Sequence, residues 1–226
     1  MTTKLDKNKI KCAVFDLDGT LLNTIKTINF YLNSALNMNG LPSVDEDHCR
    51  SFVGDGAVKL IERALDFVGD ANRASFKKTF DDYNKLYNSD PYYLTQPYEG
   101  IRDMLLCLKE REIKLAVLSN KPNFATKAAV EHFLPGMFDI VLGQRDGVAL
   151  KPAPDALFSI MDELSVAKDE TAYIGDAEPD VMTAKNASVA LGVSVLWGFR
   201  NEAQLSSAGA EIFVHSPMQV VDLIKG

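Results

Sequence analysis

The sequence has few cysteines and no cluster of basic residues. Its three cysteines, Cys12, Cys49 and Cys107, are widely separated and odd in number, which excludes a disulfide framework and a Cys-x-x-Cys metal site. The net charge is −7, and no run of lysine or arginine occurs. A nonspecific nucleic-acid-binding protein is therefore excluded, because such binding replaces counterions with basic side chains.

Long hydrophobic runs are also missing. No apolar stretch reaches the length needed to cross a bilayer, and residues 1–11 lack the apolar segment of a signal peptide. We therefore expect a cytoplasmic protein with no membrane partner. The chain has 226 residues, 46% of them hydrophobic and 24% charged, which suits one large globular domain or a domain with a smaller insert.

Short apolar runs alternate with helical patterns over residues 101–224. The predicted strands are 113–118, 138–142, 172–174, 190–196 and 212–214, and the predicted helices are 101–111, 123–133, 154–164, 180–187 and 217–224. Such alternation predicts βαβ units and a parallel sheet covered on both faces. The apolar run 12–15 supplies a further strand, near the start of the chain.

Residues 23–87 have a different pattern. They predict three helices, at 23–39, 56–68 and 71–87, with a mixed segment at 42–53 and no strand between Leu22 and Tyr92. The predicted fold is α/β: a doubly wound parallel sheet with a Rossmann-like core and an inserted all-helical cap domain. We assign residues 1–21 and 95–226 to the core and residues 22–94 to the cap. The aromatic stripe of the third helix is assigned to the cap interior; it comprises Phe76, Phe80, Tyr83 and Tyr87.

Two carboxylates stand one residue apart at the end of the first strand. In an extended chain, residues i and i+2 point the same way, so Asp16 and Asp18 should converge. Like charges so close need compensation, and a hard cation held by oxygen ligands, above all Mg²⁺, provides it. The alternative is a strand followed by an ordinary Asp-Gly turn.

Polar residues follow the other predicted strands as well: Ser119 and Asn120, then Lys151, then Asp176 and Asp180. Ligands bind at the carboxyl ends of strands in an open parallel sheet. Each residue also has a structural explanation, as a helix cap, a solvated lysine or a turn residue. Together, after successive strands, they predict a site that holds Mg²⁺ and a phosphoryl group.

These residues resemble the motifs of the haloacid dehalogenase-like hydrolase superfamily. Asp16-Leu17-Asp18-Gly19-Thr20 is similar to its first motif, Ser119 to the second, Lys151 to the third, and Gly175-Asp176 with Asp180 to the fourth. Within the superfamily, residues 53–56, 119–122 and 151–155 resemble phosphoglycolate phosphatases. Asn23 and Ala177 depart from that group, which often has an acidic residue and a serine at these positions.

The resemblance implies a Mg²⁺-dependent phosphatase acting on a small phosphorylated metabolite through an aspartyl-phosphate. It implies that Asp16 is the nucleophile and Asp18 the acid–base residue. The implied Mg²⁺ ligands are the Asp16 side chain, the Asp18 backbone carbonyl and Asp176, with Asp180 orienting them. Ser119, Asn120 and Lys151 would bind phosphate, and the cap loop Gly54-Asp55-Gly56 would approach the substrate. A homodimer is the assembly we consider.

Two alternatives stay open. A phosphosugar mutase or a pyrophosphatase of the same superfamily would share the motifs. Mutases resemble the pattern with valine in place of Thr20 and a cap histidine soon after, whereas the first histidine here is His48. A catalytically inactive binding or regulatory protein on this fold is the alternative from another class. A dehalogenase is disfavoured because Asp18 is present.

Overall fold

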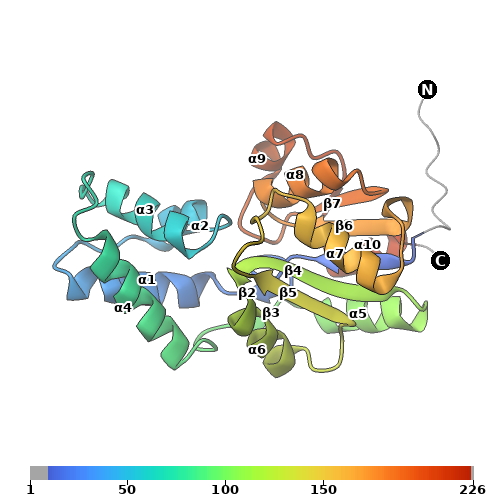
Figure 1. Ribbon diagram of the computed structural model, residues 1–226, viewed down its shortest axis with the longest axis horizontal. Coiled ribbons are helices and arrows are strands. Elements are labelled where there is room, and N and C mark those ends of the chain that lie inside the picture. Colours follow the sequence, from blue (N-terminus) through green and yellow to red (C-terminus); the bar gives the residue numbers. More distant parts are fainter. Residues whose placement is uncertain (1–9, 225–226) are drawn as a thin grey trace.

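A computed structural model of the chain describes residues 10–224, and a six-stranded parallel sheet forms its centre (Figure 1). Its strands are β1 (Cys12–Phe15), β4 (Lys114–Pro122), β5 (Ile140–Gln144), β6 (Thr171–Gly175), β7 (Leu191–Val195) and β8 (Phe213–Val214). They lie in the order β5-β4-β1-β6-β7-β8, and each neighbouring pair is parallel. The predicted parallel α/β fold is confirmed. The end of β1 is therefore flanked by the ends of β4 and β6.

Helices cover both faces of this sheet, because alternate residues of each strand point to opposite sides. In β1, Ala13 and Phe15 belong to one hydrophobic cluster, and Cys12 and Val14 belong to another. The first cluster includes residues of α5 (Ile101–Glu110), α6 (Asn123–Phe133) and α10 (Pro217–Leu223), and the second includes residues of α7 (Asp155–Leu164) and α8 (Glu178–Ala187). The sheet is thus doubly wound, as predicted.

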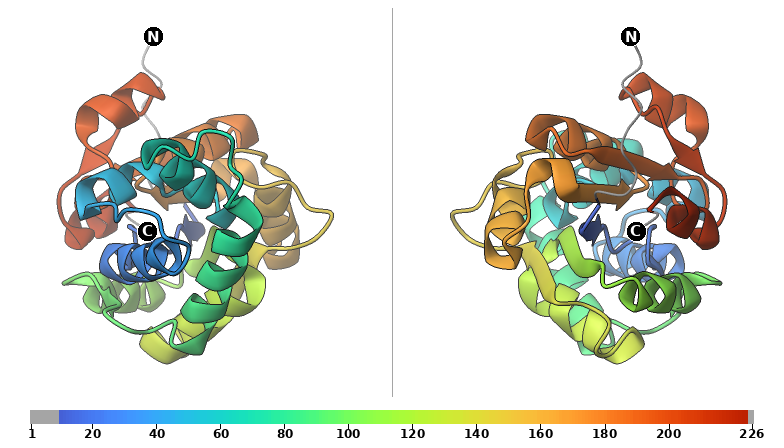
Figure 2. Two further views of the ribbon diagram at one scale, coloured as in Figure 1. Left: turned by 90° about the vertical axis from the view of Figure 1, so that its left-hand side faces the viewer. Right: turned by 90° about the vertical axis from the view of Figure 1, so that its right-hand side faces the viewer.

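A helical unit stands between β1 and β4 in the chain. It consists of α1 (Ile25–Met38), α2 (Glu46–Phe52), α3 (Ala57–Phe67) and α4 (Phe76–Ser89). These helices share a separate hydrophobic cluster, which also includes Phe199 of the core, and they group at one end of the molecule, beyond the strand ends (Figures 1 and 2). The domain boundaries at 21/22 and 94/95 remain a prediction.

The connection between core and helical unit corrects one prediction. We predicted no strand between Leu22 and Tyr92, but β2 (Leu22–Asn23) pairs antiparallel with β3 (Gln96–Pro97). A two-residue strand has no detectable alternation of polar and apolar residues, so the sequence could not indicate it. This ribbon holds the outgoing and returning chain side by side.

Some helix bounds also differ from the predicted ones. The mixed segment 42–53 contains α2, which Asp45 caps by accepting a hydrogen bond from the His48 N–H at 2.9 Å. Helix α4 begins at Phe76 instead of Ala71, because Asp70 accepts the N–H groups of Ala74 and Ser75 and holds a turn before it.

Differences in the core are smaller. Strand β5 lies two residues later than predicted, and the six-residue helix α9 (Glu202–Ser207) was not predicted. Strand β4 runs on through Pro122 with a register shift after Leu118. Ser119 and Asn120 therefore lie within an irregular end of β4 and not after it.

Candidate active site

Three carboxylates meet at the ends of β1 and β6. Asp16 directly follows β1 and Asp176 directly follows β6, and these strands pair with Phe15 opposite Ile174. One oxygen each from Asp16, Asp176 and Asp180 lies within 4.8 Å of the other two, and all three residues are buried. The structure therefore brings together Asp16, Asp176 and Asp180, which were predicted from two separate segments, but it leaves Asp18 outside this group.

Asp180 is held by the first turn of α8. Its Oδ2 accepts hydrogen bonds from the N–H groups of Asp176 at 3.2 Å and Ala177 at 3.0 Å. Its Oδ1 accepts from the Tyr173 hydroxyl at 3.1 Å. A Cβ at Gly175 would lie 2.3 Å from the Asp180 Cγ, so the strand must end in glycine for this carboxylate to fit.

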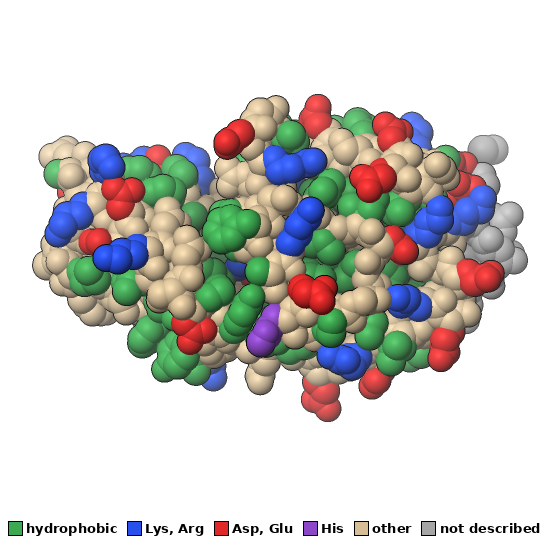
Figure 3. Space-filling view, turned by 60° about the horizontal axis from the view of Figure 1, so that its bottom comes forward, with side chains coloured by type: hydrophobic (Ala, Val, Ile, Leu, Met, Phe, Trp, Pro, Cys, Tyr) green, Lys and Arg blue, Asp and Glu red, His purple; other side chains and the backbone are tan. Residues whose placement is uncertain are grey.

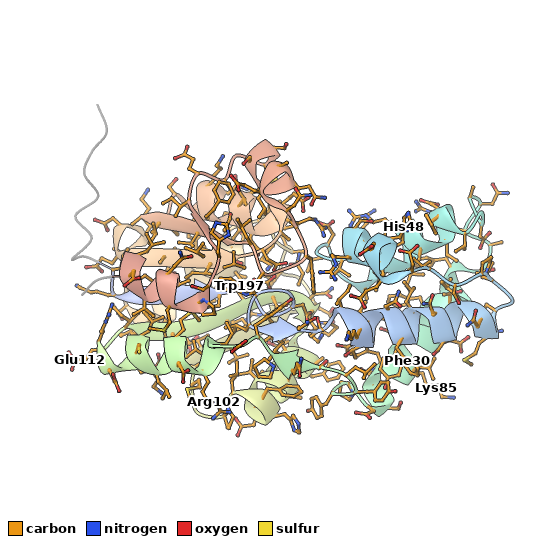
Figure 4. The ribbon with its side chains drawn as sticks, turned by 180° about the vertical axis from the view of Figure 1, so that it is seen from behind. Phe30, His48, Lys85, Arg102, Glu112 and Trp197 are labelled. Carbon is orange, nitrogen blue, oxygen red and sulfur yellow. The ribbon has the colours of Figure 1, made fainter. Side chains whose placement is uncertain are left out.

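Asp176 is held by residues to which we assigned no role. Its Oδ1 accepts from the Thr20 hydroxyl and its Oδ2 from the Phe199 N–H, both at 2.8 Å. Gly19 has φ +86°, and a Cβ there would lie 2.2 Å from Asp176 Oδ2. Trp197 lies in the core near the junction with the helical unit (Figure 4), and its Nε1 donates to the Thr20 carbonyl at 3.0 Å. The Gly19-Thr20 turn thus positions a carboxylate from another strand.

Lys151 is the cation of this cluster. Its Nζ lies 2.8 Å from Asp16 Oδ1 and 2.7 Å from Asp180 Oδ1, and its side chain is 3% exposed. Burial lowers the pKa of Lys151, but the Asp16 and Asp180 charges raise it, and the net pKa is well above the usual value. Lys151 is therefore a buried ammonium and not a solvated surface lysine.

The carboxylates outnumber the cation. Three carboxylates face one ammonium, so the group has two net negative charges when all are ionised. Burial and the Asp180 charge raise the pKa of Asp16 well above its usual range, and they raise that of Asp176 to about 7. Carboxylate oxygens and an excess of two negative charges suit a hard divalent cation.

Asp18 lies outside this acidic cluster. Its Oδ1 and Oδ2 accept hydrogen bonds from the Lys121 Nζ at 3.1 and 3.2 Å. The same Nζ contacts the Tyr87 Oη at 2.6 Å. Burial lowers the pKa of Lys121, but Asp18 and Tyr87 raise it above the usual value. We assigned no role to Lys121; the signal that could have found it is its place two residues after Ser119.

Ser119 and Asn120 are buried at the end of β4. The Asn120 side chain hydrogen-bonds to backbone groups. Its Nδ2 donates to the carbonyls of Gly54 at 3.1 Å and Lys151 at 3.2 Å, and its Oδ1 accepts the Lys151 N–H at 2.9 Å. The Ser119 Oγ accepts the Lys121 N–H at 3.3 Å. Asn120 therefore joins the predicted cap loop to the backbone of the third motif.

A cavity of about 90 Å³ lies where the helical unit meets these strand ends. The residues that line it from the core include Asp16, Asp18, Ser119, Asn120 and Lys121, and those from the helical unit include Gly54, Gly56, Leu60, Tyr83 and Tyr87. Tyr83 and Tyr87 belong to the helical core, as predicted, but also reach this cavity.

Asp55 is not among the residues that line this cavity. Its Oδ2 pairs with the Arg63 Nη2 at 2.5 Å. His48 lies on the helical unit and pairs with Asp45 (Figure 4).

Arg200 joins the core to the helical unit. The Arg200 residue is 6% exposed. Its Nη1 donates to the Arg50 carbonyl and its Nη2 to the Val53 carbonyl, both at 2.7 Å. Its Nε pairs with the Glu178 carboxylate at 2.8 Å. These carbonyls lie at the end of α2, where helices leave unpaired acceptors. The two parts form one continuous surface on the face in Figure 3, with hydrophobic side chains at their junction.

Replacing Arg200 by methionine is expected to loosen the end of α2. Each lost hydrogen bond to a charged group contributes about 1.5–3 kcal/mol, so exchange of amide hydrogens in 46–56 should become roughly 10- to 150-fold faster. Hydrogen-exchange mass spectrometry measures this. The control is Arg73→Met, since Arg73 pairs only with partly exposed carboxylates of the helical unit, Glu62 and Asp66. Unchanged exchange in Arg200→Met would contradict the expectation.

Comparisons with known proteins agree with the fold and the motifs. The haloacid dehalogenase-like hydrolase family matches residues 13–193. A phosphoglycolate phosphatase of Rhodospirillum rubrum is 31% identical over 90% of this chain and 86% of its own length. One of Vibrio vulnificus is 29% identical over 97% of this chain and 98% of its own.

Solved structures agree as well. The crystal structure of a protein from Lactobacillus delbrueckii subsp. bulgaricus has a TM-score of 0.91 and 32% identity, and the match covers 96% of this chain and 99% of that one. Among residues 10–224, no helix is both long and apolar enough to cross a bilayer. The resemblance stated from the four motifs, and the hydrolase it implied, are confirmed. This chain is a member of the haloacid dehalogenase-like hydrolase family.

Proposed function

We propose that this hydrolase is a Mg²⁺-dependent phosphatase that cleaves a small phosphate monoester through an aspartyl-phosphate on Asp16. The observation that carries the proposal is the buried group of Asp16, Asp176, Asp180 and Lys151, in which three carboxylates face one ammonium, beside a small cavity. A structural ion-pair network would have balanced charge and no cavity. A bound cation would offset the excess negative charge, and a phosphoryl group would occupy the cavity.

The Asp16 and Asp176 side chains and the Asp18 carbonyl would hold Mg²⁺, while Asp180 orients its neighbours from the first turn of α8. When bound, the ion offsets the negative charge of the carboxylate and the phosphoryl oxygens. Lys151 adds a fixed positive charge beside the Asp16 oxygen. The Ser119 hydroxyl and the Asn120 N–H would donate to a phosphoryl oxygen.

The reaction would proceed in two steps. An Asp16 oxygen forms a bond to phosphorus as the ester P–O bond breaks, and the leaving alkoxide takes a proton from Asp18. Asp18 then accepts a proton from a water molecule that attacks the aspartyl-phosphate, which releases inorganic phosphate and restores Asp16. The helical unit covers the site and limits the access of water.

The substrate is expected to be small. The cavity is small, about 90 Å³, and suits a short leaving group. The relatives from Rhodospirillum rubrum and Vibrio vulnificus are named as phosphoglycolate phosphatases, so phosphoglycolate is the first compound to test. A cytoplasmic location and a homodimer belong to the same proposal.

A phosphate-release screen tests the proposed function. Release from phosphoglycolate, glucose 6-phosphate, a nucleotide and pyrophosphate is measured in millimolar Mg²⁺ and again in EDTA. We expect release from phosphoglycolate that exceeds release from the larger compounds and that stops in EDTA. Release from pyrophosphate alone would favour the pyrophosphatase. No metal-dependent release from any compound would favour the binding protein.

A further inference from the structure

Lys121 connects the predicted acid–base residue to the helical unit. Its Nζ, at the irregular end of β4, lies 3.1 and 3.2 Å from the two oxygens of Asp18 and 2.6 Å from the hydroxyl of Tyr87 on α4. It also lies 4.7 Å from the centroid of the Tyr87 ring, and its side chain is 9% exposed. Asp18, Lys121 and Tyr87 all line the cavity.

We infer that Lys121 and Tyr87 are positioning residues: Tyr87 fixes the Lys121 ammonium, and Lys121 fixes the Asp18 carboxyl group in the orientation from which it protonates the leaving group. The inference rests on the proposed function, since it assigns to Asp18 the role of acid–base residue. It adds a contact by which the docked position of the helical unit controls that residue.

The geometry gives the reason. A single ammonium that contacts both oxygens of the carboxyl group holds that group in the direction of the ammonium. A lysine ammonium is a compact charge on a flexible four-carbon stem, so it needs a further fixed partner to stay in one place. Tyr87 provides that partner with both its hydroxyl and its ring. Because Tyr87 lies on α4, this partner is present only when the helical unit is docked on the core.

Two other roles for Lys121 make different predictions. As a merely structural ion pair, Lys121 would affect all substrates alike through stability. As a direct ligand of the substrate, it would change KM for every phosphate ester, and Tyr87→Phe, which keeps the ammonium, would have little effect. A positioning role affects proton donation, and so depends on how much the leaving group needs a proton.

The experiment compares kcat/KM for ethyl phosphate and acetyl phosphate, which are similar in size. Ethoxide is strongly basic and needs a proton to leave, whereas acetate does not. Hydrolysis of the aspartyl-phosphate is common to both and does not enter kcat/KM, which covers the steps up to departure of the leaving group. We expect Tyr87→Phe and Lys121→Met to lower kcat/KM for ethyl phosphate by roughly tenfold or more, and for acetyl phosphate by less than about twofold.

Two further variants make the result decisive. Asp18→Asn should show the same selective loss at larger size, roughly 10²–10⁴-fold. Tyr31→Phe is the matched control: its hydroxyl, also in the helical unit, donates to the Asp90 carbonyl at 2.8 Å, and Tyr31 packs on Tyr87 without lining the cavity. It should leave the ratio of the two kcat/KM values unchanged. If Lys121→Met does not fold, Tyr87→Phe, which removes only a hydroxyl, tests the inference by itself.

The outcomes separate this inference from the proposed function. Equal losses on both substrates, or no loss in Tyr87→Phe, would overturn the positioning role while wild-type turnover upholds the phosphatase. Wild-type release from acetyl phosphate alone would also overturn it, because no protonation of the leaving group would then operate. No wild-type release from either compound would count against the phosphatase itself.

Discussion

Replacing Asp16 by asparagine is expected to abolish phosphate release. An amide has no anionic oxygen to attack phosphorus, so the aspartyl-phosphate cannot form. Loss of the nucleophile in a covalent mechanism costs on the order of 10⁶-fold in kcat. The change is nearly isosteric, and Lys151 keeps its 2.7 Å contact to Asp180, so the fold should persist. The measurement is phosphate release at saturating Mg²⁺, with circular dichroism to verify folding.

The matched control for this variant is Asp162→Asn. Asp162 is an exposed aspartate in the last turn of α7, and its substitution should leave kcat unchanged. Acid quench of the wild-type enzyme with labelled substrate should trap phosphate on the protein, and Asp16→Asn should trap none. Metal-dependent turnover near the wild-type rate in Asp16→Asn would exclude the covalent scheme.

Much of the fold could be predicted because the core follows simple patterns. The α/β alternation after residue 100 gave the strand positions to within two or three residues at most ends. Helix α6 (Asn123–Phe133) has the predicted bounds. What could not be predicted depends on contacts between distant segments. The ribbon of β2 and β3 joins residues more than seventy positions apart, and no local pattern indicates such a pairing.

The residues of the candidate site also differ in whether the sequence could predict them. Residues with charges at strand ends could be found because parallel strands place their ends together. Thr20 and Arg200 could not, because their importance comes from a partner elsewhere: Asp176 for Thr20 and the end of α2 for Arg200. Composition gives no sign that a particular lysine is buried.

The charge of the site explains why Lys151 should matter most for stability. Replacing Lys151 by methionine keeps the apolar stem but removes the one ammonium that contacts both Asp16 and Asp180. Breaking a buried ion pair by removing one partner typically costs about 3–5 kcal/mol, because an uncompensated charge stays buried. We expect a loss of this size in the free energy of unfolding, measured by urea denaturation in EDTA at pH 8.

The loss should depend on pH in a definite direction. Burial and the Asp180 charge raise the pKa of Asp16 above its unfolded value, and loss of Lys151, which lowers that pKa, raises it further. A carboxyl with a raised pKa binds protons more tightly in the folded state, so folding is favoured at low pH and opposed as pH rises above about 4. The deficit of Lys151→Met relative to wild type should therefore be smaller at pH 5 than at pH 8.

Mg²⁺ should reverse part of this loss, which separates charge from packing. A ligand that binds only the folded state stabilises it by mass action, so millimolar Mg²⁺ should raise the urea midpoint of Lys151→Met. Phosphate release should stay at least roughly 10²-fold below wild type, because the fixed charge beside Asp16 is gone. Lys168→Met, which removes an exposed lysine, is the control and should change neither quantity. A Lys151→Met protein as stable as wild type at pH 8 in EDTA would mean that the acidic cluster is already neutralised by protons, and that Lys151 is not its main source of compensation.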